Sequence, residues 1–141
     1  MHLDAIELDA PGMVLLAGAI GEMPHTVMSR EQLRRGLCRA FVIGSAAEPL
    51  AAVVLPNAFP GDATAFGDDP DLIWAILRAL DDWAYVEVAR DLAPALAARI
   101  TATGADHEFS EELYFVLNHP ISARPDPRVR RLTTDDLPLL E

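Results

Sequence analysis

The chain reads Arg39-Ala40-Phe41-Val42-Ile43-Gly44 and, after a short turn, Leu50-Ala51-Ala52-Val53-Val54-Leu55. Short runs of this kind, rich in β-branched residues and bounded by glycine and proline, predict two strands joined in a hairpin. The second run is apolar at every position, which is typical of a strand that is covered on both faces. We therefore expect these two strands to form the centre of a sheet.

Two helices are expected before this hairpin. Asp9-Ala10-Pro11, followed by mainly apolar residues up to Ile20, predicts the first helix, and Gly21 ends it. Ser29-Arg30-Glu31-Gln32 matches a capping box and predicts a short second helix that ends at Gly36.

Helices and strands alternate after the hairpin. In chain order, we expect a loop over 56–66 with a short extended piece at 63–66, a helix from Asp68 or Asp69, a strand over 83–89, a helix from Asp91 to Gly104, a short strand from Phe109 and a last strand over 112–118. The whole order is helix, helix, strand, strand, helix, strand, helix, strand, strand. It predicts an α/β fold in which helices flank a mixed central sheet in two or three layers.

The composition changes after the last expected strand. Residues 119–128 contain three prolines and no apolar period, which is typical of a linker. A new strand over 129–132 and a helical turn after Asp135 follow. Because one helical turn has no core to join, we expect residues 129–141 to start a second, truncated domain. The alternative is that this tail folds back onto the first domain as an edge strand and a helical turn.

Charge and composition limit the classes of function. The formal net charge is −11, so the chain repels nucleic acid and anionic membranes at long range. Between Asp62 and Asp91 there are eight acids and only two arginines, which indicates a solvated acidic surface. No stretch has the features of a signal peptide or a membrane span, and we expect a soluble cytoplasmic protein.

Cysteine and histidine usage argues against metal and disulfide chemistry. The single cysteine, Cys38, excludes an internal disulfide and a cysteine-based zinc site, and the histidines are too dispersed for a local metal motif. Cys38 lies near Arg34, Arg35 and Arg39, which would lower its pKa at an exposed position. Without a nearby histidine, we interpret it as a small buried residue.

The tail carries a resemblance to a known family. Val129-Arg130-Arg131-Leu132-Thr133-Thr134-Asp135-Asp136-Leu137-Pro138-Leu139-Leu140 resembles the opening of a GNAT N-acetyltransferase domain, which has an arginine-bearing strand, a Thr-x-x-Asp cap and a leucine-rich first helix. The element order of residues 11–118 resembles the GNAT fold as well. Phe66-Gly67-Asp68-Asp69-Pro70 and the apolar strand 113–117 are similar to degenerate GNAT-like domains that precede an active one.

This resemblance implies a division of labour within a longer protein. Residues 1–118 would be a degenerate GNAT-like N-terminal domain, 119–128 a linker, and 129–141 the start of a catalytic GNAT domain. The first domain would supply scaffold, substrate cleft or dimer contacts, with a homodimer as one possibility. Acetyl-CoA would bind to the C-terminal domain, and the acceptor would be a small-molecule or peptide amine.

The cofactor loop expected of a GNAT enzyme is not present in the first domain. Such enzymes bind the pyrophosphate of acetyl-CoA with a Q/R-x-x-G-x-G/A segment that enters a long helix. The corresponding stretch here, Phe59 to Asp71, lacks this pattern, and Pro70 removes one N–H donor. Asp68, Asp69 and Asp71 place carboxylates at the positive end of the helix. We therefore expect no cofactor-binding residues in this domain.

Two residues are candidates for catalysis. Glu87 interrupts an apolar strand on the same face as Trp83 and Tyr85, and beside the splayed cleft of a GNAT-like sheet it could act as a general base. The alternative is a solvent-facing glutamate. Tyr114 could protonate a leaving thiolate, as a tyrosine does in many GNAT enzymes, although the family tyrosine usually lies elsewhere. The alternative is a half-buried tyrosine with a satisfied hydroxyl.

Three functions remain open from the sequence. The first is a non-catalytic scaffolding domain attached to a GNAT acetyltransferase domain. The second is a free-standing acyl-CoA-dependent N-acyltransferase with an atypical cofactor site. The third is a ligand-binding or regulatory module, which requires residues 129–141 to belong to the first fold.

Overall fold

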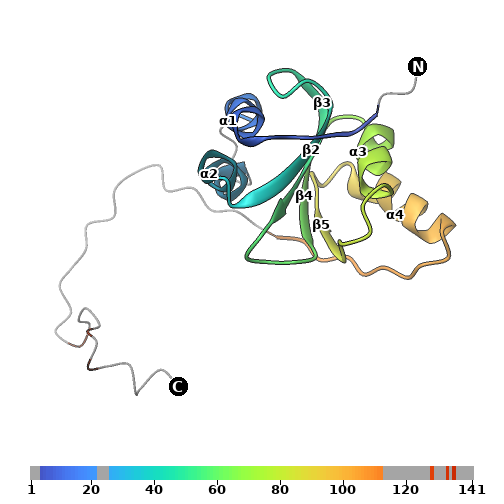
Figure 1. The fold of residues 1–141 in the computed structure, drawn as a ribbon. Coiled ribbons are helices and arrows are strands. Elements are labelled where there is room, and N and C mark those ends of the chain that lie inside the picture. Colours follow the sequence, from blue (N-terminus) through green and yellow to red (C-terminus); the bar gives the residue numbers. More distant parts are fainter. Residues whose placement is uncertain (1–3, 22–25, 113–127, 129–132, 134, 136–141) are drawn as a thin grey trace.

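A five-stranded mixed sheet forms the middle of the structure (Figure 1). The computed structural model describes residues 4–21, 26–112, 128, 133 and 135. The strands lie in the sheet in chain order: β1 (Ile6–Glu7), β2 (Cys38–Gly44), β3 (Pro49–Pro56), β4 (Asp62–Gly67) and β5 (Tyr85–Glu87). Neighbouring strands are antiparallel, except that β4 and β5 are parallel. The prediction of an α/β fold with a mixed sheet is confirmed.

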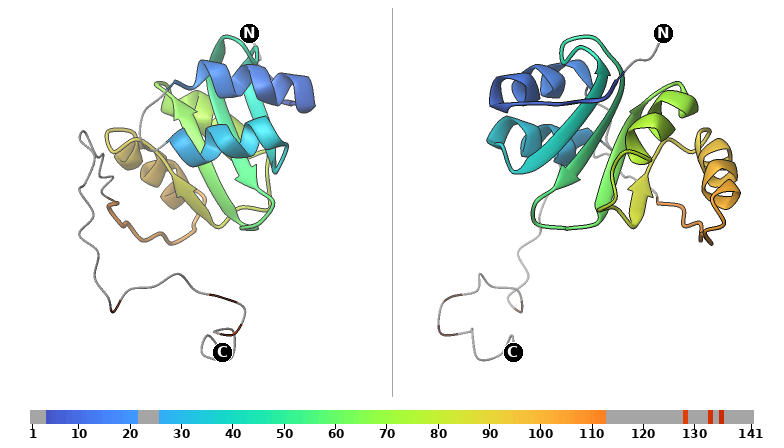
Figure 2. Two further views of the ribbon diagram at one scale, coloured as in Figure 1. Left: turned by 90° about the vertical axis from the view of Figure 1, so that its left-hand side faces the viewer. Right: turned by 45° about the vertical axis from the view of Figure 1, so that its right-hand side comes forward.

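Helices cover both faces of this sheet, so the domain has three layers. α1 (Ala10–Ala19) and α2 (Val27–Arg35) lie on one face, and α3 (Pro70–Leu77) and α4 (Ala93–Ala102) lie on the other (Figure 2). Of the two layer arrangements that the sequence left open, the structure has the one with three layers.

The β2–β3 hairpin is the centre of the core. Successive residues of a strand point to opposite faces of the sheet. Ile43 and Val53 therefore pack in the cluster under α3 and α4, whereas Val42 and Val54 pack with Leu16 on the side of α1 and α2. All five side chains are fully or almost fully buried. The expectation of a central hairpin covered on both faces is confirmed.

The first helix begins where the sequence indicates. The Asp9 carboxylate accepts a hydrogen bond from the Gly12 amide at 2.9 Å, and Pro11 occupies the first turn. The second helix ends as expected, because Gly36 adopts the left-handed conformation with φ 65°.

The prediction that a capping box at Ser29 starts the second helix is wrong. α2 begins one turn earlier, with Thr26 at the N-cap, and Ser29 is a buried residue inside the helix. The Thr26 hydroxyl donates a hydrogen bond to the Gly21 carbonyl oxygen at 3.2 Å, so it joins the start of α2 to the end of the preceding segment. Packing of α2 against the sheet thus outweighs the local capping signal.

The sequence prediction missed two strands, β1 and most of β4. β1 pairs with β2 through only two residues, which is too short for a hydrophobic pattern. The stretch predicted as a loop with a short extended piece at 63–66 contains the full strand β4, which pairs with both β3 and β5. Its inward-facing residues are Ala63 and Ala65. Alanine has a low strand propensity, and burial under α3 overrides it.

β5 is shorter than the expected strand over 83–89. Trp83 lies outside it because its indole nitrogen donates a hydrogen bond to the Leu77 carbonyl oxygen at 2.8 Å. The ring also meets Trp74 edge to face, with centroids 6.5 Å apart. Trp83 is therefore tied to the end of α3, and only Tyr85 to Glu87 join the sheet.

The predicted cap of the last described helix and the predicted strand after this helix are both wrong. Asp91 does not cap α4, whose N-cap position is Leu92 and whose first turn contains a proline. Residues 105–112 contain no strand, and Phe109 instead meets the ring of His107 edge to face at 5.1 Å. The rest of the expected last strand and nearly all of the tail from 119 onward lie outside the described residues.

Alanine substitutions at two glycines should change the free energy of unfolding in opposite directions. Gly67 ends β4 with φ 130°, and a Cβ added there would lie 2.8 Å from the Leu50 carbonyl oxygen. We expect Gly67→Ala to lower the free energy of unfolding by about 2–4 kcal/mol. Gly18 on α1 has nothing within 4 Å of an added Cβ, so Gly18→Ala should raise it by about 0.5 kcal/mol. Urea unfolding measures both, and a Gly67→Ala protein as stable as the wild type contradicts the prediction.

Candidate functional site

The junction between β4 and α3 is the place where a GNAT-like domain would hold a phosphate. β4 ends at Gly67 and α3 begins at Pro70, so only Asp68 and Asp69 connect them. Six of the thirteen residues in the stretch that the sequence prediction treated as a cofactor loop, 59–71, therefore belong to a strand. The junction lies at the carboxyl end of two parallel strands, where open α/β sheets commonly bind ligands.

Carboxylates already occupy the start of α3. The Asp69 side chain accepts a hydrogen bond from the Asp71 amide at 2.8 Å, and Pro70 has no amide hydrogen to donate. The Asp71 carboxylate forms an ion pair with Arg99 of α4. Arg99 is thus held by a carboxylate, and a phosphate would have to displace Asp69 to reach the Asp71 amide.

A hollow of about 430 Å³ lies beside this junction on the side of α1 and α2. Ile20, Ala52 and Phe66 contribute apolar wall, and Asp68 contributes a carboxylate. None of the described residues that line the hollow carries a positive charge. The hollow therefore offers nothing to neutralise a polyanionic cofactor.

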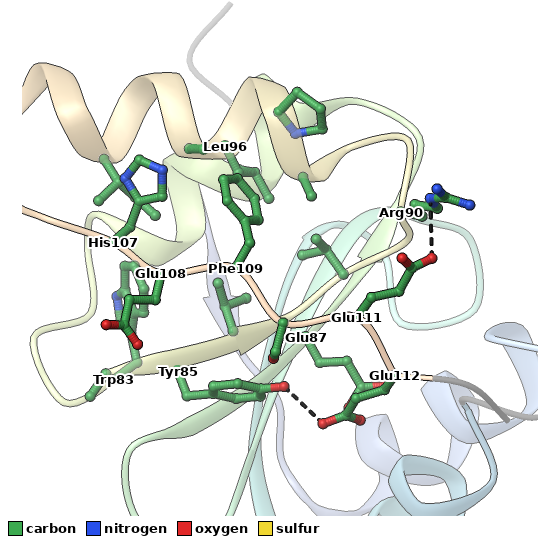
Figure 3. A pocket seen from close by; sticks show the side chains of 18 of the residues that line it. Trp83, Tyr85, Glu87, Arg90, Leu96, His107, Glu108, Phe109, Glu111 and Glu112 are labelled. Carbon is green, nitrogen blue, oxygen red and sulfur yellow. Dashed lines mark hydrogen bonds and ion pairs between the residues drawn. The ribbon is translucent and has the colours of Figure 1, made fainter.

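A larger pocket of about 850 Å³ lies between β5, α4 and residues 105–112, and we call it the β5 pocket (Figure 3). Trp83, Leu96 and Phe109 give it apolar walls. Its ionised side chains are mostly carboxylates and include Glu87, Glu108, Glu111 and Glu112. Arg90 is an exposed cation at the rim, and it forms an ion pair with Glu111 at 3.3 Å. The pocket therefore suits an apolar group that carries a positive charge better than it suits an anion.

The β5 pocket contains one of the two predicted catalytic residues. Glu87 lines it together with Trp83 and Tyr85, and the residues between them line it as well. Tyr114, the other candidate, lies outside the described residues. The tyrosine that the structure places beside Glu87 is Tyr85, which the sequence pattern indicates only as a residue on the same face of the strand.

Tyr85 has the character of a proton donor. Its hydroxyl donates a hydrogen bond to the Glu112 carboxylate at 3.1 Å, as Figure 3 shows. Partial burial raises the pKa of Tyr85 above its usual value. The charges of Glu112 and Glu87 act in the same direction, and a hydrogen bond with Ser110 opposes them. The phenol therefore stays protonated well above neutral pH.

Cys38 is a core residue rather than a nucleophile. It is buried on β2, with its sulfur 3.9 Å from the Met13 sulfur. Burial raises the pKa of the thiol to about 11. Its neighbour Arg39 points its guanidinium to the carboxylates of Glu7 at 2.9 Å and Asp82 at 3.1 Å. The interpretation of Cys38 as a small buried residue is confirmed.

Two further observations concern the described residues alone. No group of three or more His, Cys, Asp or Glu side chains in this part of the chain is placed to hold a metal ion. No helix in the same residues is long and apolar enough to cross a bilayer.

Comparison with known proteins found no relative of this chain. The scan against family models gave no match, and the searches of curated proteins and of solved structures gave none either.

The raised pKa of Tyr85 can be measured directly. The chain has two tyrosines, so the Tyr114→Phe protein reports Tyr85 alone in an absorbance titration at 295 nm. We expect a midpoint above about 10, the value for free tyrosine, because burial and two carboxylates disfavour the phenolate. Glu112→Gln in the same background should lower the midpoint. Circular dichroism must show that the fold persists over the titration, and a midpoint at or below that of free tyrosine contradicts the expectation.

The reactivity of Cys38 tests its burial. Because its pKa is about 11, few thiolates exist at pH 8, and we expect Ellman's reagent to react on the order of 100-fold more slowly than with the unfolded chain. Ala47→Cys adds a thiol at an exposed turn position and serves as the fast-reacting control. Equal rates for the two cysteines would show that Cys38 is accessible.

Proposed function

We propose that this chain is a non-catalytic, GNAT-like domain that supports an acetyl-CoA-dependent N-acetyltransferase domain of the same protein. In this proposal it supplies scaffold and part of the cleft for a small-molecule or peptide amine. Residues 129–141 would open the catalytic domain, and acetyl-CoA would bind there rather than to residues 1–118.

The order of the elements supports a GNAT-like arrangement. Two helices precede the central hairpin, and a helix, a strand and a helix come later in the chain, as in the family order on which the resemblance rests; β1 before the first helix and β4 after the hairpin are additional strands. The helix α3 connects two neighbouring parallel strands, β4 and β5, so its first turn lies at the junction where the cofactor phosphate would be sought.

The occupied start of α3 is the observation that carries the non-catalytic part of the proposal. A helix N-terminus binds phosphate through free amide groups and the positive end of its dipole. Here Asp69 accepts from the Asp71 amide, Pro70 has none, and Asp71 binds Arg99. A diphosphate at this position would meet carboxylates in place of donors, and like charges at such distances repel.

A free-standing acyltransferase is the second candidate, and one observation favours it. Glu87 and Tyr85 line the same pocket, where the first could take a proton from an amine and the second could protonate a leaving thiolate. The carboxylates of the same pocket repel a coenzyme, and Arg90 is already paired with Glu111. We therefore prefer the non-catalytic proposal.

Titration calorimetry separates the two candidates. We expect acetyl-CoA and CoA to give no binding heat with the 141-residue chain at ligand concentrations up to about 1 mM, because Asp69 and Pro70 remove amide donors from the diphosphate at the start of α3. Micromolar binding would defeat the non-catalytic proposal. If such binding were lost in Arg90→Ala, and amine acetylation were lost in Glu87→Gln, the free-standing enzyme would be supported instead.

The architecture has a test of its own. Under the proposal, the coding sequence continues after Glu141 for roughly another domain, about 100–200 residues, and includes the Q/R-x-x-G-x-G/A pattern. A stop codon directly after Glu141 would contradict the two-domain arrangement without bearing on whether the first domain binds a cofactor.

A further inference from the structure

The β5 pocket has the size of a small-molecule site. Its volume of about 850 Å³ lies within the range of roughly 300–1,000 Å³ that is usual for such sites. Its walls come from β5, α4 and residues 105–112 (Figure 3). The chemistry of these walls indicates which class of ligand the pocket can hold.

One part of the wall is apolar. Leu96 and Ile100 lie four residues apart on one side of α4, and Phe109 points toward that helix (Figure 3). Phe109 and Tyr85 are 64% and 41% exposed, although both side chains are large and mainly apolar. An aromatic or alkyl group in the pocket would cover these surfaces and remove them from water.

The charged part of the wall is mainly negative. Five acids line the pocket against a single arginine, and these acids are Glu87, Asp106, Glu108, Glu111 and Glu112. The arginine, Arg90, lies at the rim with 87% of its side chain exposed, and it pairs with Glu111. The pocket as a whole therefore attracts a cation and repels an anion.

Two of these carboxylates lie close to one phenol on the β5 side of the pocket. The Tyr85 hydroxyl donates a hydrogen bond to the Glu112 carboxylate at 3.1 Å, and the negative charges of Glu112 and Glu87 both raise the pKa of Tyr85. Two carboxylates that act on the same hydroxyl also repel each other, and a cation between them would relieve this repulsion. The faces of the Trp83 and Tyr85 rings attract cations as well.

We propose that the β5 pocket binds a hydrophobic organic cation. Its ammonium group would lie beside Glu87 and Glu112, and its aromatic or alkyl group would lie against Leu96 and Phe109. A neutral apolar ligand would gain nothing from the carboxylates, and the described side chains are not grouped to hold a metal ion. Binding of this kind requires only a positive charge and an apolar group, so it does not depend on acetyl transfer or on the proposed function.

An amide NMR titration of the full 141-residue chain tests the proposal. Phenylbutyltrimethylammonium is the probe, because its charge does not change with pH and it has no N–H group to acetylate. We expect saturable shifts confined to β5, α4 and residues 105–112, with a Kd of about 1 mM or lower, as is usual for a ligand of this size.

Three related ligands separate the contributions of charge and apolar area. Phenylbutanol and phenylbutyrate carry the same apolar group without the positive charge, and tetramethylammonium carries the charge without the apolar group. Each should bind at least about tenfold more weakly than the probe, because each lacks one of the two interactions.

A pair of charge variants tests the carboxylates. Glu87→Gln with Glu112→Gln should weaken binding of the probe at least about tenfold and leave binding of phenylbutanol unchanged, because only the cation interacts with their charges. Glu31→Gln with Glu48→Gln is the matched control. It removes the same number of charges at exposed positions outside the pocket and should bind the probe like the wild type.

A pair of aromatic variants tests the apolar wall. Phe109→Ala should weaken binding of the probe by about threefold or more, because it removes apolar contact area. Phe59 is 57% exposed and lies outside the pocket, so Phe59→Ala should bind like the wild type. The amide spectrum of each variant shows whether the fold persists, and the ligand series on the wild type does not depend on any variant.

Three results would overturn the proposal. One is a wild type that shows no saturable shifts with the probe, or shows them on α1 and α2 instead. Another is binding of phenylbutanol or phenylbutyrate that is as tight as binding of the probe. The third is a folded Glu87→Gln/Glu112→Gln protein that binds the probe as tightly as the Glu31→Gln/Glu48→Gln control.

Discussion

The strand β3 imposes a constraint that the other elements satisfy. Its residues Ala51 to Leu55 are all buried, and they point alternately to the two faces of the sheet. Apolar side chains on both faces of a strand must be covered on both faces to leave water. One helix pair would leave half of β3 exposed, so the chain needs α1 and α2 on one side and α3 and α4 on the other. The three-layer architecture follows from this requirement.

Burial decreases from this centre toward β5. The strands β2 and β3 are buried over most of their length, whereas β5 has three residues and none is fully buried. Trp83 is held by the end of α3 instead of the sheet. Side chains near β5 can therefore be polar without being forced into the core, and Glu87 and Tyr85 occur there. Local opening at this end of the domain should therefore require less free energy than at the β2–β3 centre.

α1 and α3 begin with the same aspartate cap, and at α3 this cap bears on function. Asp9 and Asp69 each accept a hydrogen bond from an amide of the first turn, and each helix has a proline at its start. Carboxylate capping suits an acidic chain because it places negative charge at the positive end of a helix. It also uses the donors that a phosphate would need. At α3 the stabilising role and a cofactor-binding role therefore exclude each other.

The sequence alone predicts the β2–β3 hairpin, a helix start near Asp9, another at Asp68 or Asp69, and the Gly36 stop, because patterns of neighbouring residues encode all of them. It also placed Glu87 beside Tyr85, since alternation along a strand is local. Tertiary packing accounts for three further features: 62–67 is a strand, Ser29 is buried inside α2, and Trp83 contacts the end of α3. β4 and Ser29 depend on packing against other elements, and Trp83 depends on a turn that brings it back to Leu77, six residues earlier. In each case this packing outweighs the local preference.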